Sequence, residues 1–267
     1  MIVPWLKSSQ KRSFSKKKNK LIPLGHLYRE MAIILNIETA TNICSVALAK
    51  DLTIISFKES SEEKSHAANL TVFIKEILTS QKLMPADLDA ISVSKGPGSY
   101  TGLRIGVATA KGLSYGSNIP LIAVSTLQAM AFGMINSKKF SSIKIKDPAN
   151  IWFCPMIDAR RMEVYLSFYD FQYREKREVS ADIIKPGIYD FILNKRKVIF
   201  FGTGSGKCKN ILNHPNAVFI DGFNTSAAFM TQLAYQNYMK KEFENTAYFE
   251  PYYLKDFIAT KPRKNIF

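Results

Sequence analysis

The stretch KGPGSYTGLRIG, at residues 95–106, constrains the fold more than any other part of the sequence. The apolar run at 88–94 that precedes it predicts a short buried strand. Residues 96–98 combine two glycines with a proline and end this strand, and Ser99 or Thr101 can cap the helix that follows. The stretch therefore predicts a strand, a glycine turn and a helix in succession.

This glycine turn has two interpretations. Free backbone N–H groups and the helix dipole make such a corner able to bind phosphate. However, Pro97 removes one N–H donor and no P-loop lysine follows, so the residues favour a structural corner. Beyond the turn, Gly102, Gly106 and Ala110 recur every four residues and predict a bare helix face that another backbone can approach closely.

Strands and helices alternate on both sides of this stretch. Residues 32–38, 43–49 and 52–57 predict three strands joined by short turns, which is typical of an antiparallel meander. A helix at about 66–81 carries its apolar side chains at helical spacing: Leu70, Phe73, Ile74, Ile77 and Leu78. With a further strand at 120–124, the pattern predicts an α/β lobe with a mixed sheet.

The second half of the chain repeats the alternation less clearly. Residues 151–157 and 162–168 predict a hairpin, and 138–150 a loop or a junction between lobes. At the tip of the hairpin, Asp158 and Arg160 either clamp an anionic ligand or stabilise the turn, which is the commoner role.

A second glycine turn, at 202–207, follows an apolar strand predicted at 197–201. Its spacing is one residue short of a P-loop, and Cys208 stands where the magnesium-binding hydroxyl belongs, so it is not a Walker motif. Such a turn can approach a nucleotide closely or simply reverse the chain. The last predicted helix covers 226–241, and the tail after it is basic and aromatic.

The net charge of +15 is unevenly distributed. Residues 1–30 contain eight Lys or Arg and one Glu, a charge of +7, which leaves +8 for the rest of the chain. The remainder is only moderately basic, which allows a weak attraction to RNA without specific reading of it. Three interpretations of 1–30 stay open: a solvated basic tail, a targeting segment, or sequence upstream of a true start at Met31, which we favour.

Cysteine and histidine usage limits the chemistry. Cys44, Cys154 and Cys208 show no paired spacing, which argues against a disulfide framework or a zinc knuckle and suits a reducing compartment. The three histidines lie far apart, so no histidine metal site is expected; His66 is expected to cap or pack, without a partner nearby. No apolar run is long enough to span a bilayer, and we expect a cytoplasmic protein.

Three segments together resemble the TsaB (YeaZ) family, the bacterial subunit needed for threonylcarbamoyladenosine modification of tRNA. They are IILNIETATNICSVAL at 33–48, KGPGSYTGLRIG at 95–106 and IDARRMEVY at 157–165. The resemblance implies the two-lobed actin/Hsp70-like (ASKHA, ribonuclease H-like) α/β fold with mixed sheets. In chain order, we expect a leader at 1–30, an N-terminal lobe at 31–133, a C-terminal lobe at 134–225, and at 226–267 a last helix that returns to the N-terminal lobe, with a basic tail.

By the same resemblance, a nucleotide would lie between the first hairpin turn and the glycine turn of the second lobe. No cofactor is firmly implied, although ATP or ADP could bind at the interface of a complex. The residues expected near such a nucleotide are Glu38, Thr39, Thr41, Gly96, Gly98, Gly202 and Gly204.

The resemblance also separates a catalyst from its partner. The catalytic relative, TsaD, carries two histidines four residues apart on a helix after a strand, and these can hold a metal. The aligned positions here are Thr126 and Met130, which are poor ligands for such a metal. We therefore expect no catalytic or metal-binding residues, and a non-catalytic subunit that organises TsaD.

The partners implied are a TsaD-like catalytic subunit, a TsaE-like ATPase, tRNA reached through the complex, and a second copy of this chain when TsaD is absent. Family members pair with TsaD through the first two helices, which correspond to 66–81 and 101–116. The expected contact residues are Tyr100, Thr101, Gly102, Arg104, Gly106, Ala110, Leu70, Phe73 and Ile77. Alternatively these faces pack on their own sheet; Tyr100, Thr101 and Arg104 are the better candidates for contact.

Two other functions stay open from the sequence. One is an enzyme of the same superfamily, either an ATP-dependent phosphotransferase or a metallopeptidase. Glu38 and the two glycine turns would support phosphate binding, but no nucleophile or metal constellation supports the chemistry. The other is an RNA-binding protein that acts through its basic leader and tail.

Overall fold

The computed structural model describes residues 31–61, 66–143, 147 and 150–255. A first mixed sheet has the strand order β3-β2-β1-β4-β5. Neighbouring strands are antiparallel from β3 to β1 and parallel from β1 to β5. Its strands are β1 (Ile33–Glu38), β2 (Cys44–Lys50), β3 (Thr53–Ser60), β4 (Ala90–Gly96) and β5 (Leu121–Ser125). The predicted meander and mixed sheet are confirmed.

A second sheet repeats the plan of the first, with the order β10-β9-β6-β7-β8. Three antiparallel strands again come first, and two parallel strands follow on the other side of the first of them. Its strands are β6 (Ile151–Asp158), β7 (Glu163–Tyr169), β8 (Glu175–Ile183), β9 (Lys197–Phe201) and β10 (Ala217–Ile220). Two sheets of one plan confirm the predicted two-lobed α/β fold.

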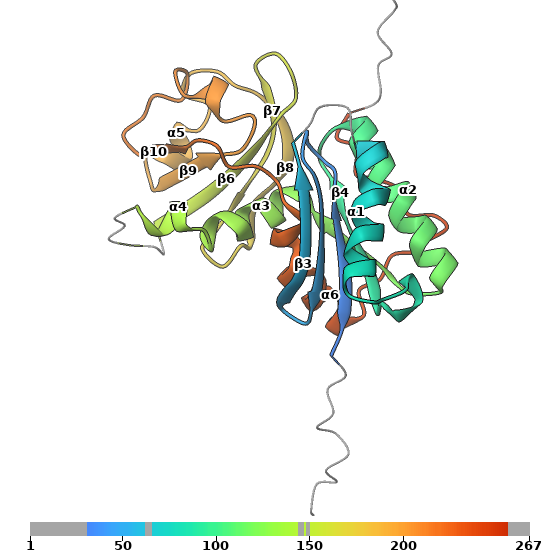
Figure 1. The fold of residues 1–267 in the computed structure, drawn as a ribbon. Coiled ribbons are helices and arrows are strands. Elements are labelled where there is room, and N and C mark those ends of the chain that lie inside the picture. The colour runs from blue at the N-terminus through green and yellow to red at the C-terminus, as the bar shows by residue number, and fades with distance from the viewer. Residues whose placement is uncertain (1–30, 62–65, 144–146, 148–149, 256–267) are drawn as a thin grey trace, which may run out of the picture. The chain divides into compact units, whose positions relative to one another are not determined.

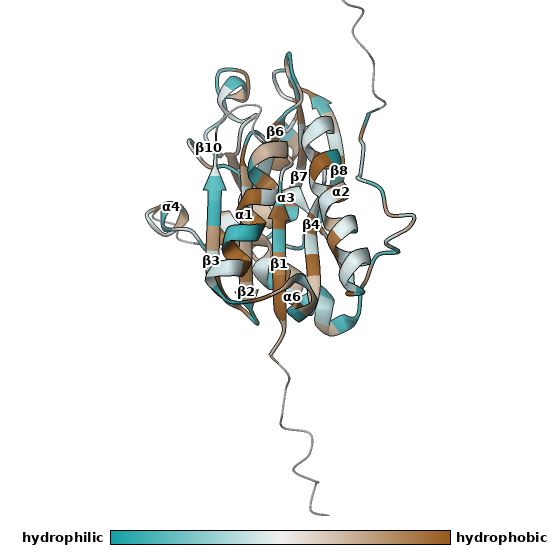
Figure 2. Ribbon diagram, turned by 45° about the vertical axis from the view of Figure 1, so that its right-hand side comes forward, coloured by the Kyte–Doolittle hydropathy of each residue, from teal (hydrophilic) through white to brown (hydrophobic). Residues whose placement is uncertain are grey.

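Helices cover the first sheet on both faces (Figure 1). Leu70 and Ile77 from α1 (His66–Ser80) and Val107 from α2 (Tyr100–Ser117) join the core on one face. Met230 and Leu233, from the 3-10 helix η5 (Ala227–Met230) and from α6 (Thr231–Lys240), pack on the other face. Because both faces are covered, the strands read as nearly continuous apolar runs, brown along most of β1 in Figure 2.

The helix α3 (Thr126–Ile135) lies between the two sheets. Its Ala129 packs in the core of the first sheet, and its Leu127 and Met134 pack with residues of the second. On the far face of the second sheet, Ile192 of α5 (Asp190–Leu193) closes a further core. The remaining short helices are α4 (Lys138–Ser141), η2 (Pro85–Asp87) and η4 (Gly206–Cys208).

Most predicted elements lie within two residues of the observed ones, but the second half holds more structure than predicted. The strand β8 was missed because its sequence, EKREVSADI, is largely charged, as befits a strand at the edge of a sheet. The helix α3 was implied only through the resemblance to TsaD, and the short elements α4, α5 and β10 were also missed. The leader predicted at 1–30 lies outside the described residues. Within the part of the chain that is described, each helix is too short or too polar to cross a membrane.

Candidate functional site

The glycine corner after β4 packs on the turn between β1 and β2. Ser99 caps α2 by accepting a hydrogen bond from the Gly102 amide, and its own amide donates to the carbonyl of Ala40 at 2.6 Å. A Cβ atom on Gly98 would lie 2.3 Å from that same Ala40 oxygen. Glycine is thus required here because two backbones touch, which agrees with the corner interpretation.

The helix face made by Gly102, Gly106 and Ala110 is turned inward. A Cβ atom on Gly102 would lie 2.1 Å from the backbone oxygen of Thr39, and one on Gly106 would lie 2.2 Å from the Thr39 hydroxyl oxygen. That hydroxyl donates to the Gly102 carbonyl at 2.8 Å, and Ala110 is fully buried. The predicted close approach is real, but the approaching backbone belongs to the chain's own first turn.

Five of the predicted contact residues are buried inside the first lobe, and a sixth, Phe73, is partly buried there. Leu70, Ile77 and Ala110 are fully buried in the core of the first sheet, and Phe73 packs partly buried against the same core. Gly102 and Gly106 are buried against Thr39 of the first turn. These residues therefore serve the packing of the free chain, and their contact with a partner stays a prediction. Tyr100, Thr101 and Arg104 remain at the surface.

Glu38 is a buried carboxyl group at the end of β1. One of its oxygens accepts hydrogen bonds from the Ala40 amide at 2.6 Å and from the Ser94 hydroxyl at 3.0 Å, while the other is buried without a hydrogen-bond partner. Burial outweighs these hydrogen bonds and raises the pKa of Glu38 to about 7. Glu38 therefore holds the first turn in place, and about half of it is protonated at pH 7.

The glycine turn of the second lobe is also filled by the chain itself. A Cβ atom on Gly202 would lie 2.4 Å from the Met156 carbonyl oxygen, and one on Gly204 would lie 2.8 Å from a methyl carbon of Val164. Gly96 is covered in the same way, since its Cβ position is 2.8 Å from the carbonyl oxygen of Tyr252. The glycines thus have structural reasons of their own, and a nucleotide beside them stays a prediction.

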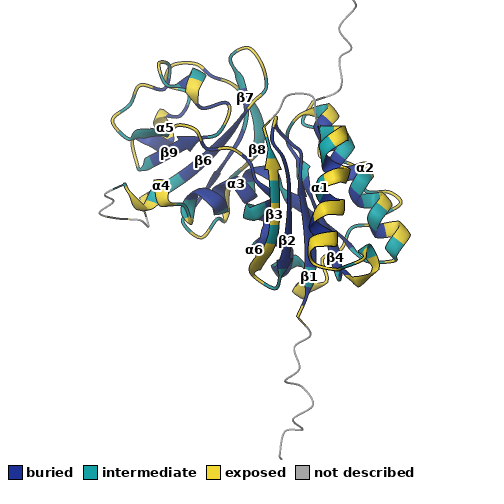
Figure 3. Ribbon diagram, viewed as in Figure 1, coloured by how far each residue is buried: buried dark blue, intermediate teal, exposed yellow. Residues whose placement is uncertain are grey.

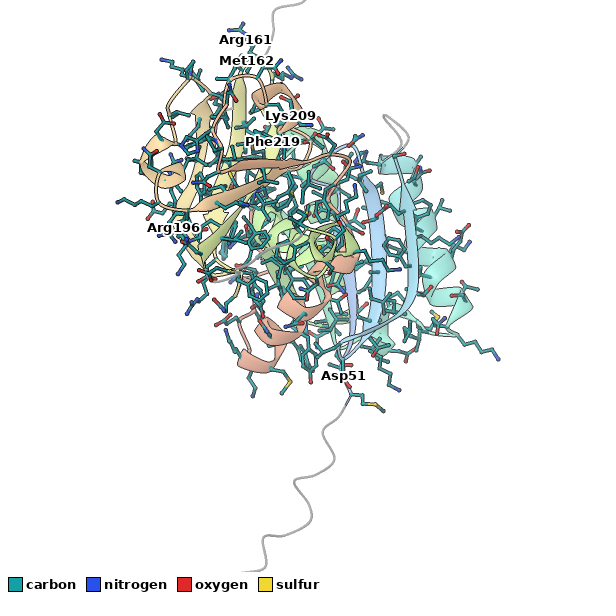
Figure 4. The ribbon with its side chains drawn as sticks, turned by 90° about the vertical axis from the view of Figure 1, so that its left-hand side faces the viewer. Asp51, Arg161, Met162, Arg196, Lys209 and Phe219 are labelled. Carbon is teal, nitrogen blue, oxygen red and sulfur yellow. The ribbon has the colours of Figure 1, made fainter. Side chains whose placement is uncertain are left out.

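Lys207, which follows this turn, fastens the β6–β7 hairpin. Its ammonium group lies 2.5 Å from Asp158 and donates to the carbonyls of Arg161 and Glu163 at 2.7 Å. Figure 4 labels Arg161 at the tip of this hairpin. The turn-stabilising role expected for Asp158 is confirmed, but its charged partner is Lys207, and Arg160 contributes only its backbone amide.

Thr41, which was also predicted to lie near a nucleotide, takes part in a contact between the two lobes. Thr41 is mostly buried and its hydroxyl lies 2.8 Å from that of Thr225, which precedes η5. The Thr41 carbonyl oxygen also lies 2.8 Å from Nε2 of His66. The expectation that His66 lacks a partner was therefore wrong, because a helix distant in sequence is packed on the first turn.

Thr126 and Met130, which the resemblance aligns with the two histidines of TsaD, are packing residues in the structure. Thr126 and Met130 lie one turn apart at the start of α3, and both are buried. The terminal methyl of Met130 lies 2.7 Å from the Cβ position of Gly202, so this side chain fills space between α3 and the second glycine turn. The described residues contain no group of three or more His, Cys, Asp and Glu side chains placed to hold a metal.

A polar cleft of about 390 Å³ lies where the two sheets approach each other. The first lobe contributes the ends of β4 and β5 and the start of α3, and the second contributes β7 and β8. The lining residues are Lys95, Gly96, Ser125, Gln128, Tyr169, Glu175, Glu178, Val179 and Tyr252. Burial and the neighbouring Glu178 raise the pKa of Glu175. The sequence pattern did not indicate this cleft, because three of its nine lining residues come from the missed strand β8.

The outer face of α2 is a candidate interaction surface that the structure adds. Its exposed residues recur at helical spacing: Thr101, Arg104, Ala108, Gly112, Tyr115 and Gly116. Cβ atoms built on Gly112 and Gly116 would meet nothing within 4 Å, and Tyr115 is 84% exposed. The adjacent face of α1 is also exposed (Figure 3), with Val72 48% exposed. We missed this second stripe of small residues, although Ala108, Gly112 and Gly116 have the same four-residue spacing.

Comparison with known proteins places the chain in a family. A family model described as "TsaD: tRNA N6-adenosine threonylcarbamoyltransferase" matches residues 58–261. The "tRNA threonylcarbamoyladenosine biosynthesis protein TsaB" of Escherichia coli K12 is 30% identical over 237 residues, which cover 85% of this chain and 96% of that protein. The chain belongs to the TsaB family. The TsaB protein of Haemophilus influenzae is 29% identical over 85% of this chain and 95% of its own length.

Solved structures support the same fold. "YeaZ from Pseudomonas aeruginosa" superimposes with a TM-score of 0.70 at 24% identity, covering 84% of this chain and all of that one. A second Pseudomonas aeruginosa structure, of a protein described as similar to the peptidase YEAZ, gives 0.72 at the same identity and coverage. The resemblance of the three sequence segments to the TsaB family is thereby confirmed, and with it the fold.

Proposed function

We propose that this chain acts in the biosynthesis of threonylcarbamoyladenosine on tRNA, as its TsaB relatives are named to do. Within that process it is a non-catalytic subunit that binds and organises a TsaD-like catalytic subunit, which transfers threonylcarbamoyl to adenosine 37. Family membership supports the process. The packing roles of Thr126 and Met130 support the absence of catalysis, because these side chains fill a core where the catalytic relative presents metal ligands.

The exposed outer face of α2 is the main support for the proposed binding of a catalytic subunit. Ala108, Gly112 and Gly116 leave the middle of the helix bare, while Arg104 and Tyr115 stand at its two ends. Small residues on an exposed helix allow another helix to approach closely, and large side chains around them fix its position. Tyr100 and Thr101 extend the surface to the helix start, beside Arg104.

The test compares the same substitution at two exposed glycines, one on the proposed docking face and one away from it. Gly112, on α2, and Gly206, in the second lobe, are both exposed, with open space at their Cβ positions. Each is replaced by arginine in the full chain, which is then co-purified with the TsaD-like subunit of the same organism. Arginine favours a helix over glycine by about 1 kcal/mol, so Gly112→Arg does not weaken α2.

We expect Gly112→Arg to abolish co-purification and the tRNA modification that depends on both proteins, while Gly206→Arg retains both. Retention of the complex by Gly112→Arg would refute docking through α2. Modification that proceeds without this chain would refute the subunit role itself. In the proposed complex a TsaE-like ATPase, ATP or ADP and tRNA join as further components, and a second copy of the chain uses the same face when the catalytic subunit is absent.

A further inference from the structure

The segment after α6 runs back along α2 (Figure 1). Lys111 of α2 holds its beginning, because the ammonium group donates to the carbonyls of Ala247 and Phe249 at 3.1 and 2.9 Å. Phe249 also packs against the core of the first sheet. The segment is therefore attached to the first lobe before it reaches the cleft.

At the cleft, Tyr252 joins the end of β4. Its amide donates to the Lys95 carbonyl at 2.7 Å, and its own carbonyl oxygen closes over Gly96. Both Lys95 and Gly96 line the polar cleft, and Tyr252 lines it with them. The backbone of the segment thus forms one edge of the opening.

The next residue, Tyr253, lies at the proposed docking surface, which is the outer face of α2 with Tyr100, Thr101 and Arg104 at its start. Its ring lies 5.0 Å from that of Tyr100, and its hydroxyl accepts a hydrogen bond from Nε of Arg104 at 3.3 Å. The Arg104 guanidinium in turn lies 4.1 Å above the ring of Tyr100. A partner seated on Tyr100 and Arg104 would therefore also touch, or displace, Tyr253.

Two residues further on, the segment reaches the second lobe. The ammonium group of Lys255 pairs with the carboxylate of Glu163, at the start of β7, whose side chain is only 16% exposed. Glu163 pairs in the sheet with Ile183 of β8, the strand that forms the opposite wall of the cleft. Residues 247–255 are thus fixed to the first lobe at one end and to the second lobe at the other.

We propose that residues 247–255 are a strap between the lobes, which forms part of the partner-docking surface and sets the opening of the polar cleft. Neighbouring residues carry the two roles: Tyr253 faces the docking surface while Tyr252 borders the cleft and Lys255 holds the second lobe. A partner that changes the position of Tyr253 changes the distance between the lobes. The strap itself is a property of the free chain; only its coupling to a partner rests on the proposed function.

The strap is tested by a distance measurement across the lobes. The native thiols Cys44, Cys154 and Cys208 are fully buried, so cysteines introduced at Leu52 (57% exposed, before β3) and Phe191 (62% exposed, in α5) can be labelled selectively. Spin labels or a fluorophore pair at Leu52→Cys and Phe191→Cys in the full chain then report the separation of the lobes. The strap is released by Tyr253→Ala combined with Lys255→Ala, and Tyr248→Ala, at a residue 84% exposed, is the matched control.

We expect the released strap to give a broader distribution at longer distances, while the Tyr248→Ala chain matches the wild type. Tyr253→Phe, which keeps the ring contact but loses the hydrogen bond to Arg104, should give a smaller shift and serves if the double variant does not fold. An unchanged distribution in folded strap variants, or an equal change in the control, would overturn the strap.

Adding the TsaD-like subunit to the labelled wild-type chain should shift the distribution, and the shift should be lost in the released variant. Binding without any shift in the wild type would overturn the coupling while leaving the docking proposal intact. Failure of the subunit to bind the wild type would instead count against the proposed function, and the measurements on the free chain would still decide whether the strap exists.

Discussion

Replacing Gly102 by alanine tests the packing of α2 on the first turn. The added methyl group would lie 2.1 Å from the backbone oxygen of Thr39, far inside contact distance. This oxygen cannot rotate away, and the turn is held by the hydrogen bonds of Thr39 and Glu38. Forcing an extra methyl group into a packed site costs about 1–3 kcal/mol. Alanine regains about 1 kcal/mol by favouring the helix.

Because the clash is with backbone, we place its cost at the upper end of that range and expect a net loss of about 2 kcal/mol. For a domain of this size, such a loss lowers the thermal midpoint by about 4–8 °C. The control is Gly112→Ala in the same helix, where the new methyl group meets nothing within 4 Å. There only the helix propensity changes, and the midpoint should rise by about 2–4 °C.

Both variants are to be measured by differential scanning calorimetry or by circular dichroism at one protein concentration. A Gly102→Ala chain as stable as Gly112→Ala would show that α2 does not rest on the first turn. The assignment of the Gly102, Gly106 and Ala110 face to the interior would then fall, and with it the argument that the partner uses the opposite face.

Two further predictions concern stability. The native pKa of Glu38, about 7, exceeds the ordinary value of 4.5, so between these pH values the folded chain binds a proton that the unfolded chain has lost. The folded chain therefore loses about 3 kcal/mol of stability in total as the pH rises through this range. Glu38→Gln should remove this pH dependence in denaturant titrations, and an identical dependence in the variant would refute the assignment. Lys207→Met should destabilise the chain by about 1–3 kcal/mol, because it removes three contacts of a largely buried ammonium group. The control is Lys209→Met, at a more exposed pair with Asp221, which should cost less than about 1 kcal/mol. Equal losses in the two variants would contradict the fastening role of Lys207.

Buried strands and edge strands differ in how clearly their sequences show them. The first half of the chain was predicted well because its inner strands β1, β2 and β4 are buried on both faces and its turns carry glycine or polar residues, signals that lie within a few neighbouring residues. The strand β8 escaped prediction because an edge strand faces water along much of its length and keeps charged side chains.

The predicted partner-contact residues fall into two groups, one at the surface and one in the core. Tyr100, Thr101 and Arg104 were chosen for their place at a helix start and lie at the surface, whereas Leu70 and Ile77 were chosen for an apolar stripe and lie in the core. A stripe of apolar or small residues shows that a face is covered closely, but it does not show what covers it.

The sequence by itself determined most of the strands, the glycine corners, the family and which residues share a helix face, because all of these follow from local conformation and from periodicity. Only the tertiary structure decided which of two equal stripes on α2 is free: Gly102, Gly106 and Ala110 rest on Thr39, while Ala108, Gly112 and Gly116 face outward. It also brought Lys255 to Glu163, across 92 residues of sequence. Such contacts depend on how whole sheets and helices pack, and spacing along the chain carries no record of that.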